Sequence, residues 1–163
     1  MPVTNYLSPT AFDVSISRLP NVEFFVQAVT IPDISSVAVS TDNPVKPFYD
    51  VPDRLAYGDL SMTLIADENL ENYYEILTWM EGIGSPQSSE QYKRLAASPN
   101  GLRADISIII LNSAKNPNKK FTFNNCFPTT LGSLELSNTT ADIEYSTYTA
   151  DFRYDGFVLE NIE

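Results

Sequence analysis

Short stretches in which apolar and polar residues alternate recur along most of this chain. Such alternation is typical of a half-buried β-strand, because successive side chains of a strand point to opposite faces. The pattern is strict in residues 12–17 and 59–64, and it returns in residues 120–124 and 146–154. Residues 104–111 are almost continuously apolar, as expected for a central strand covered on both faces. The pattern therefore predicts a mainly β protein.

The N-terminal part predicts a hairpin after an irregular start. Residues 1–11 are expected to form an N-terminal arm, since Ser8-Pro9-Thr10 interrupts any regular element. The strand at 12–17 is followed by Leu19-Pro20-Asn21 and by a second strand at 23–30, which together favour a hairpin with a short loop. A third, weaker strand is expected at 35–40.

Residues 41–58 predict a long, stiff loop. They contain three prolines, each of which fixes the backbone φ angle. Loops of this length are uncommon in compact domains and are often functional. Exposed aromatic and basic side chains on such a loop favour an inter-subunit contact, although a loop folded back onto its own sheet is the alternative. The candidate contact residues are Lys46, Phe48, Tyr49 and Arg54.

A helix is predicted over residues 69–82, with Asp67 or Asn69 as the cap. Apolar residues at helical spacing form one stripe, which is expected to pack against the sheets. The stripe consists of Leu70, Tyr73, Tyr74, Leu77 and Met80. Within it, Tyr73, Leu77 and either Leu70 or Met80 are expected to be buried, whereas Trp79 is expected to be partly exposed. A second, short helix is expected over residues 90–97.

The composition excludes several classes of function. The chain has 163 residues, enough for one domain (1–163). It contains no histidine and a single cysteine, Cys126, so histidine-dependent catalysis, an internal disulfide and a multi-cysteine zinc site are excluded. We expect no enzyme activity and no cofactor. The longest apolar run, residues 108–111, is too short to cross a bilayer, and the first residues lack a signal core, so a cytoplasmic site of synthesis and assembly is expected.

Several predicted strands carry a second face that is small, hydroxylated or acidic and contains no lysine. The net charge of −11 also disfavours tight binding of nucleic acid through its phosphates. Such a face could be an ordinary solvated sheet surface. The alternative is the smooth wall of a channel. The candidate lumen-facing residues are Ser15, Ser61, Thr63, Thr147, Thr149 and Asp151.

The C-terminal part carries a family resemblance. Residues 126–136 read as a strand, a Pro/Gly turn and a short strand, and a long strand follows that ends near residues 157–159. The element Phe-Pro-Thr-x-x-Gly-x-Leu-x-Leu at 127–136, together with the strand-to-helix junction at 58–80, resembles the tail tube proteins of contractile-tailed bacteriophages. The resemblance covers almost the whole chain, and matches loosely in the N-terminal arm and in residues 84–100.

The resemblance implies a fold and a function. The implied fold has two antiparallel sheets packed as a β-sandwich or barrel, with one flanking α-helix. The implied function is structural: homohexameric rings stack into the inner tube of a contractile tail, through which DNA passes without specific binding. Implied partners are further copies of the chain, the tail sheath protein, and the baseplate and tail terminator proteins, all in the virion tail.

Two other interpretations remain open at this point. One is a baseplate tube-initiating protein or a secretion-system tube ring of the same fold. The other is a monomeric β-sandwich binding module, which would remain a monomer at high concentration.

Overall fold

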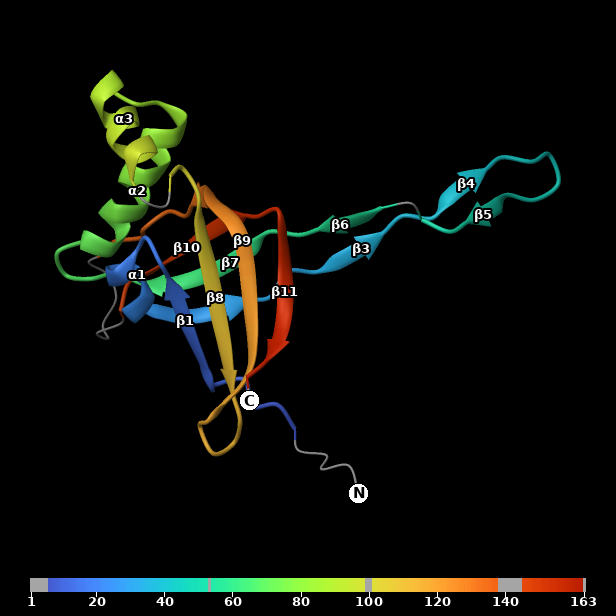
Figure 1. Cartoon of the computed structure of the whole chain (residues 1–163), viewed down its shortest axis with the longest axis horizontal. Helices are drawn as coiled ribbons and strands as arrows, with labels where there is room; N and C mark the ends of the chain where they lie inside the picture. The colour runs from blue at the N-terminus through green and yellow to red at the C-terminus, as the bar shows by residue number, and fades with distance from the viewer. Residues whose placement is uncertain (1–5, 53, 99–100, 138–144, 163) are drawn as a thin grey trace.

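The fold is built on one seven-stranded antiparallel sheet, with the strand order β1-β8-β9-β10-β7-β2 and with β11 also paired to β9 (Figure 1). The computed structural model describes residues 6–52, 54–98, 101–137 and 145–162. The strands of this sheet are β1 (Phe12–Ile16), β2 (Val26–Thr30), β7 (Leu60–Ile65), β8 (Ala104–Leu111), β9 (Pro117–Leu131), β10 (Thr147–Arg153) and β11 (Gly156–Asn161). The prediction of a mainly β, antiparallel protein is therefore confirmed.

Strand β9 joins two half-sheets. Its first part pairs with β8 and β11, and its last part pairs with β10. We call β1, β8, β11 and the start of β9 the first half-sheet, and β2, β7, β10 and the end of β9 the second half-sheet. Two packed sheets were expected, whereas the structure has one bent sheet. This is possible because β9, with 15 residues, is long enough to pair with strands of both half-sheets.

The bend in β9 lies at Asn125. This residue has a φ of 57°, a left-handed conformation that asparagine tolerates better than most residues. The pairing with β8 shifts register here, between Ile106↔Phe123 and Ala104↔Cys126. The backbone N–H of Asn125 donates to Asp105 Oδ1 at 2.9 Å, and its side-chain amide donates to Asp155 Oδ2 at 2.9 Å. The first bond satisfies the backbone N–H that the bulge removes from the ladder, and the second fixes the side chain beside it.

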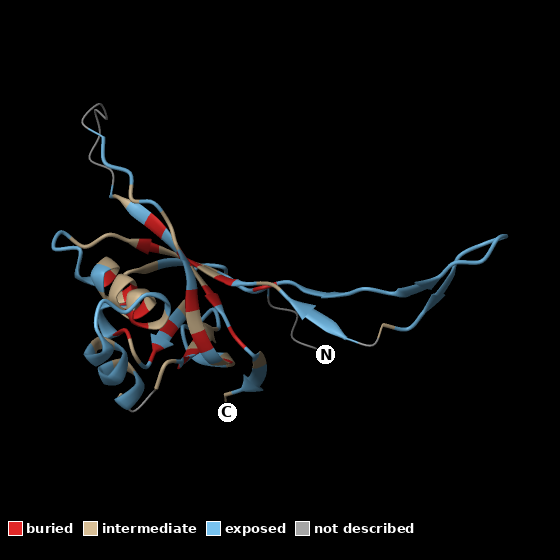
Figure 2. Ribbon diagram, turned by 90° about the horizontal axis from the view of Figure 1, so that it is seen from above, coloured by how far each residue is buried: buried red, intermediate tan, exposed pale blue. Residues whose placement is uncertain are grey.

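The core lies between the two half-sheets. Its largest fully buried apolar side chains come from both halves and from the helix that covers them (Figure 2). They are Ile16, Leu60, Met62, Leu64, Ile76, Trp79, Ile106, Phe123 and Phe152. Cys126 is also fully buried, and burial raises the pKa of its thiol to about 12. The thiol therefore stays protonated and has the role of a small apolar side chain.

Three helices accompany the sheet, whereas the family resemblance implied one flanking helix. They are α1 (Pro20–Phe24), α2 (Glu71–Gly84) and α3 (Ser89–Ala97). Helix α2 is the long helix expected over 69–82, and the second, short helix expected over residues 90–97 is confirmed as α3. The side chain of Ser88 accepts a hydrogen bond from the backbone N–H of Gln91 and so caps α3.

The buried side of α2 differs from the predicted stripe. Ile76 and Trp79 are fully buried, whereas Leu70 and Tyr74 are exposed and Leu77 is half-buried outside the core. The expectation that Trp79 is partly exposed is wrong, because its indole ring packs against Phe152 and its N–H donates to the carbonyl of Leu102 at 3.0 Å. Tyr73 and Met80 contact the edge of the core.

The start of α2 is held by Asn72 rather than by Asp67 or Asn69. No side chain makes a cap hydrogen bond at the N-cap position, Leu70. Asn72 is fully buried; its amide donates to the carbonyl of Ile65 at 2.7 Å, and its Oδ1 accepts from the backbone N–H of Tyr73 at 2.8 Å. One side chain thus ties the end of β7 to the first turn of the helix.

Two predicted connections differ in the structure. Strands β1 and β2 do not form a hairpin: α1 separates them, and they pair with β8 and β7 in different half-sheets. At the C-terminal end, β9 continues through Pro128 to Leu131, and the residues from 132 to 137 form no strand. The long final strand is divided into β10 and β11 at Asp155, whose N–H donates to the carbonyl of Asn124.

The segment predicted as a long loop is part of a two-stranded extension. Strands β3 (Ile34–Ser36) and β6 (Leu55–Tyr57) pair near the body, and β4 (Val39–Thr41) and β5 (Phe48–Asp50) pair further out. We call residues 34–57 the hairpin arm. It projects far from the body in both ribbon views (Figures 1 and 2). Residues 6–11, the described part of the expected N-terminal arm, contain no helix or strand.

We expect Ile76→Ala to destabilise the subunit more than Leu77→Ala. Ile76 is fully buried in the core, so its truncation should leave a cavity and lower the free energy of unfolding by about 2–5 kcal/mol. Leu77 is half-buried, which makes Leu77→Ala the matched control. Urea unfolding of both variants measures the difference, and equal losses would show that the core side of α2 is misassigned.

We expect Gly132→Ala to destabilise the second half-sheet. A Cβ at Gly132 would lie 2.4 Å from Thr149 Oγ1 and 2.9 Å from the carbonyl oxygen of Thr149, so the backbone has to shift. Such overpacking costs about 1–3 kcal/mol. Gly84→Ala is the control, because nothing lies within 4 Å of its Cβ position. Thermal unfolding should show a lower midpoint for Gly132→Ala alone.

Candidate assembly surfaces

The hairpin arm exposes its side chains along almost its whole length (Figure 2). Strand β5 carries Phe48 and Tyr49, and both aromatic side chains are exposed. Lys46 lies in the turn between β4 and β5, and Arg54 lies just before β6; both are exposed. The structure therefore places all four predicted contact residues on the arm and away from the body. This arrangement excludes the alternative of a loop folded back onto its own sheet.

Further apolar side chains on the arm were not identified from the sequence. They are Val37, Val39, Val45, Val51 and Leu55, and each is exposed. Residues 35–40, which include Val37 and Val39, were predicted as a weak strand, but a strand pattern normally indicates one buried face. Several exposed apolar side chains gathered on one extension are typical of a protein–protein interface.

The base of the arm is held firmly against the body. The backbone N–H of Gly58 donates to the carbonyl of Asp33 at 3.0 Å, which closes the two-stranded ribbon. The ring of Tyr57 makes edge-to-face contacts with Tyr154 and Phe157, at centroid distances of 6.2 and 6.0 Å. Such aromatic contacts stabilise beyond the area that they bury. The direction in which the arm leaves the body is thus set by packing.

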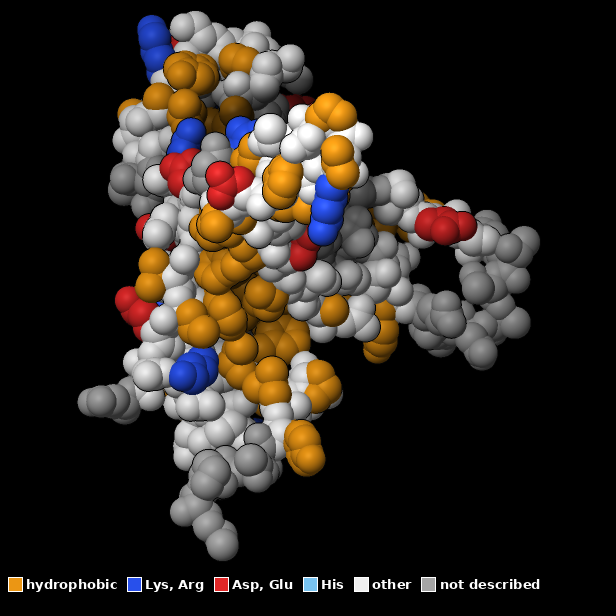
Figure 3. All heavy atoms as spheres, turned by 90° about the vertical axis from the view of Figure 1, so that its right-hand side faces the viewer, with side chains coloured by type: hydrophobic (Ala, Val, Ile, Leu, Met, Phe, Trp, Pro, Cys, Tyr) orange, Lys and Arg blue, Asp and Glu red, His pale blue; other side chains and the backbone are white. Residues whose placement is uncertain are grey.

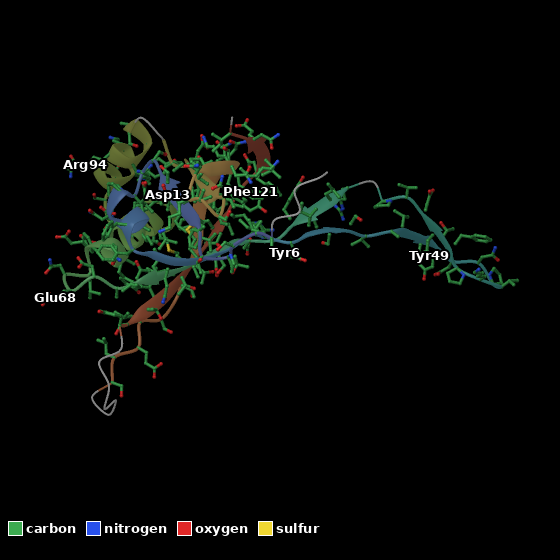
Figure 4. The ribbon with its side chains drawn as sticks, turned by 90° about the horizontal axis from the view of Figure 1, so that it is seen from below. Tyr6, Asp13, Tyr49, Glu68, Arg94 and Phe121 are labelled. Carbon is green, nitrogen blue, oxygen red and sulfur yellow. The ribbon has the colours of Figure 1, made fainter. Side chains whose placement is uncertain are left out.

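A second apolar surface lies on the body beside the arm. Figure 3 views the molecule from the arm side and shows hydrophobic side chains gathered over the body beneath the arm. A groove of about 390 Å³ is lined by Leu7, Phe121 and Leu159, among others. Figure 4 places Phe121 and Tyr6 near the arm base. This apolar part of the body therefore lies on the side of the molecule from which the arm projects.

Five of the six candidate lumen residues lie together on the outer face of the second half-sheet. In the ladder between β10 and β7, Thr149 pairs with Thr63 and Asp151 pairs with Ser61, while Thr147 precedes them on the same face. We call these five residues the hydroxyl-rich face. The alternate residues of β7 and β10 point into the core, so the register that the sequence indicated for these strands is correct.

Charge on this face is low. Arg153 lies at its end and forms an ion pair with Asp59, so that both charges are compensated. Thr129 donates a hydrogen bond to the carbonyl of Asp151 at 3.1 Å. The face is therefore polar and short-chained, with Asp151 as an acidic group.

Ser15 is not part of the hydroxyl-rich face. It lies on β1 in the first half-sheet, paired with Ser107 of β8. Strands β8 and β9 separate β1 from β10 in the strand order. Periodicity showed that Ser15 points away from the core, but it could not show which half-sheet β1 belongs to.

Three strands of the sheet have an unpaired edge within the described part of the chain. Strand β1 pairs only with β8, β2 only with β7, and β11 only with β9. Open edges are ready to pair with strands of another chain. Among the described residues, no cluster of three or more acidic or cysteine side chains could hold a metal ion. The described helices include none that is long and apolar enough to cross a membrane.

Comparisons with solved structures show the same architecture. A chain of the PVC sheath–tube complex, an extracellular contractile injection system in its extended state, superposes with a TM-score of 0.69 and 17% identity, over 98% of this chain and 95% of that chain. A chain of the anti-feeding prophage cap gives a TM-score of 0.70 and 16% identity, over 99% and 95%. A chain of the anti-feeding prophage baseplate gives 0.66 and 12%, over 96% and 97%. At these identities the likeness shows a shared fold.

The sequence comparison identifies the family. A search of curated proteins found no match. The family model for phage tail tube proteins, however, matches residues 3–160, which is nearly the entire chain. This family is structural, so its members are not enzymes. The chain therefore belongs to the phage tail tube protein family.

Proposed function

We propose that this protein forms hexameric rings that stack into the inner tube of a contractile tail, and that DNA is ejected through this tube. The observation that carries the proposal is the hairpin arm, which exposes an apolar surface far from its own body. An isolated subunit gains nothing from such an extension, because exposed apolar area is unfavourable in water. A neighbouring copy that covers the arm removes that cost.

The proposed ring uses the open edges of the bent sheet. Pairing between neighbouring copies would satisfy the backbone groups of an edge strand, and closure of the ring would remove the edges. The proposed stack uses the arm, with Lys46, Phe48, Tyr49 and Arg54 in contact with a subunit of the next ring. Aromatic residues and arginine are enriched in the cores of protein interfaces.

The hydroxyl-rich face is the proposed wall of the channel. Serine and threonine side chains are short, and the net charge of −11 repels a polyanion. DNA would pass along such a wall without tight binding, since affinity for phosphates requires lysine and arginine. The proposal assigns the wall to Ser61, Thr63, Thr147, Thr149 and Asp151, and leaves Ser15 on another surface.

The proposed partners are a tail sheath protein, a baseplate and a tail terminator. Support comes from the likeness to chains in sheath–tube, baseplate and sheath/tube terminator assemblies, although this likeness is one of fold. The proposed location is the tail tube of the particle, with assembly in the cytoplasm of the host. A tube-initiating ring of the baseplate is the second candidate, favoured by the baseplate likeness, and it would form single rings in place of long tubes.

We expect the purified protein to form rings and, with increasing concentration, tubes that electron microscopy can detect. Deletion of residues 44–52 removes the outer part of the arm and should leave folded subunits or rings without tubes, because the deleted residues lie away from the core. Circular dichroism confirms folding of the deletion variant. A wild-type protein that stays monomeric at high concentration would overturn the assembly, and normal tubes from the deletion variant would overturn the role of the arm.

We expect lysine on the hydroxyl-rich face to slow DNA ejection. In the double variant Thr63→Lys/Thr149→Lys, each copy places two adjacent cations on the proposed wall, where they attract phosphates. Ser15→Lys is the control, because Ser15 is exposed on the other half-sheet. Tubes should form in all cases, and ejection should be slow for the double variant alone. Equal ejection rates in a particle-based assay would count against this wall.

A further inference from the structure

An apolar groove lies at the end of the second half-sheet opposite to the hairpin arm. The arm leaves the body between the end of β2 and the start of β7. The groove, of about 600 Å³, lies where β7 ends and β10 begins, in front of the first turn of α2. We call it the distal groove. Figure 4 shows Glu68, on its rim, and Tyr49, on the arm, at opposite ends of the molecule.

The distal groove is apolar inside and acidic at its rim. Its apolar lining includes Ile65, Leu70, Leu134, Leu136 and Tyr145. Leu136 and Tyr145 are 78% and 79% exposed, and Leu70 is held in a left-handed conformation with a φ of 55°. Both charged residues that line the groove are acidic, Asp67 and Glu68. No lysine or arginine occurs anywhere in residues 55–92.

The outer end of the hairpin arm has the complementary character. Val45 and Lys46 lie in the turn between β4 and β5, flanked by two prolines that stiffen it. Val45 is 92% exposed, and Phe48 and Tyr49 follow it on β5. Lys46 is the sole basic residue of this turn and directly follows Val45, whereas the acidic Asp42 lies at the start of the turn, four positions earlier. The turn therefore offers an apolar side chain and a cation to a groove that offers apolar walls and two carboxylates.

The geometry restricts the source of the arm that occupies the groove. Because the arm and the groove lie at opposite ends of one molecule, a subunit cannot fill its own groove (Figure 4). Two copies placed head to tail bring the arm of one toward the groove of the other. A contact between two different surfaces of identical copies is heterologous, and it can be repeated along an axis without limit.

We infer that the distal groove is the receptor for the arm of a second copy in the neighbouring ring, with Val45 seated among Leu70, Leu136 and Tyr145 and with Lys46 beside Asp67 and Glu68. This inference rests on the proposed stacking of rings and names the surface that receives the arm. The apolar contact supplies most of the buried area, and the charge pair sets the position and the orientation of the turn.

Charge reversal tests the electrostatic half of the contact. Lys46→Glu places an anion beside two carboxylates, and Glu68→Lys places a cation beside Lys46. Each single variant should raise the concentration required for tubes by about tenfold or more, because like charges oppose docking. The double variant Lys46→Glu/Glu68→Lys should recover much of the loss. Lys93→Glu, on α3, is the matched control for loss of a surface cation and should change little.

Disulfide trapping tests the position directly. A Val45→Cys variant is mixed with a Leu136→Cys variant under mild oxidation, and a cross-linked dimer is expected on a non-reducing gel. The native Cys126 does not interfere, since it is fully buried. A mixture of Val45→Cys with Ser15→Cys is the control, because Ser15 lies on the other half-sheet.

The outcomes separate the two levels of the proposal. Tubes from the wild type, together with the cross-link and recovery in the charge-reversed double variant, support the distal groove as the receptor. Tubes without the cross-link, or without recovery in the double variant, overturn the inference and leave the proposed function intact. Loss of rings in the Lys46→Glu variant also overturns it, by placing the contact within a ring. A wild type that forms no tubes overturns the proposed function itself.

Discussion

The bend of β9 at Asn125 is the constraint on which the rest of the structure depends. One strand of 15 residues has to serve two half-sheets, and its ladder with β8 shifts register at Asn125, where the strand passes from one half-sheet toward the other. Asn125 adopts the left-handed conformation, and its backbone and side-chain N–H groups donate hydrogen bonds to Asp105 and Asp155. Arg103 forms an ion pair with Asp155 at 2.9 Å. Directly after the bend, Cys126 enters the core. The bend at Asn125 lies between the part of β9 that pairs in the first half-sheet, which carries Ser15, and the part that pairs in the second half-sheet, which carries the hydroxyl-rich face.

The positions of the strands could be predicted because alternation is a local property. The run from Leu60 to Leu64 shows its buried face in the sequence itself, and the structure has the same register. Partners of strands could not be predicted in the same way. The interval between β1 and β2 is short enough for a hairpin, but β1 pairs with β8 and β2 pairs with β7, and both partners lie far along the chain. Asn124-Asn125 was a possible signal for a bulge, although an asparagine pair is equally typical of a turn.

The helix and the arm show two other limits of periodicity. Apolar residues occur on several sides of α2, so a stripe that includes Leu77 and a stripe that includes Ile76 fit the sequence equally well. The burial of the polar Asn72 depends on a hydrogen bond to the carbonyl of Ile65, at the end of another element. The arm contains apolar residues at strand spacing, yet it has no core to cover. A sequence pattern shows that a surface avoids water; it does not show whether the surface is covered by the same chain or by another one. For this reason the four arm residues were found, whereas the valines around them and the distal groove were missed.

The arm leaves the body at one end only, and this gives any head-to-tail stack a polarity. One terminus of the stack would present free arms and the other free grooves, so the two termini would differ in shape and in charge even though every subunit is identical. A protein that starts growth and a protein that stops it would then face different chemistry: one has to receive or imitate an arm, and the other has to bind or imitate a groove. Growth from a single end, with a fixed direction from start to finish, would be a property of the subunit itself.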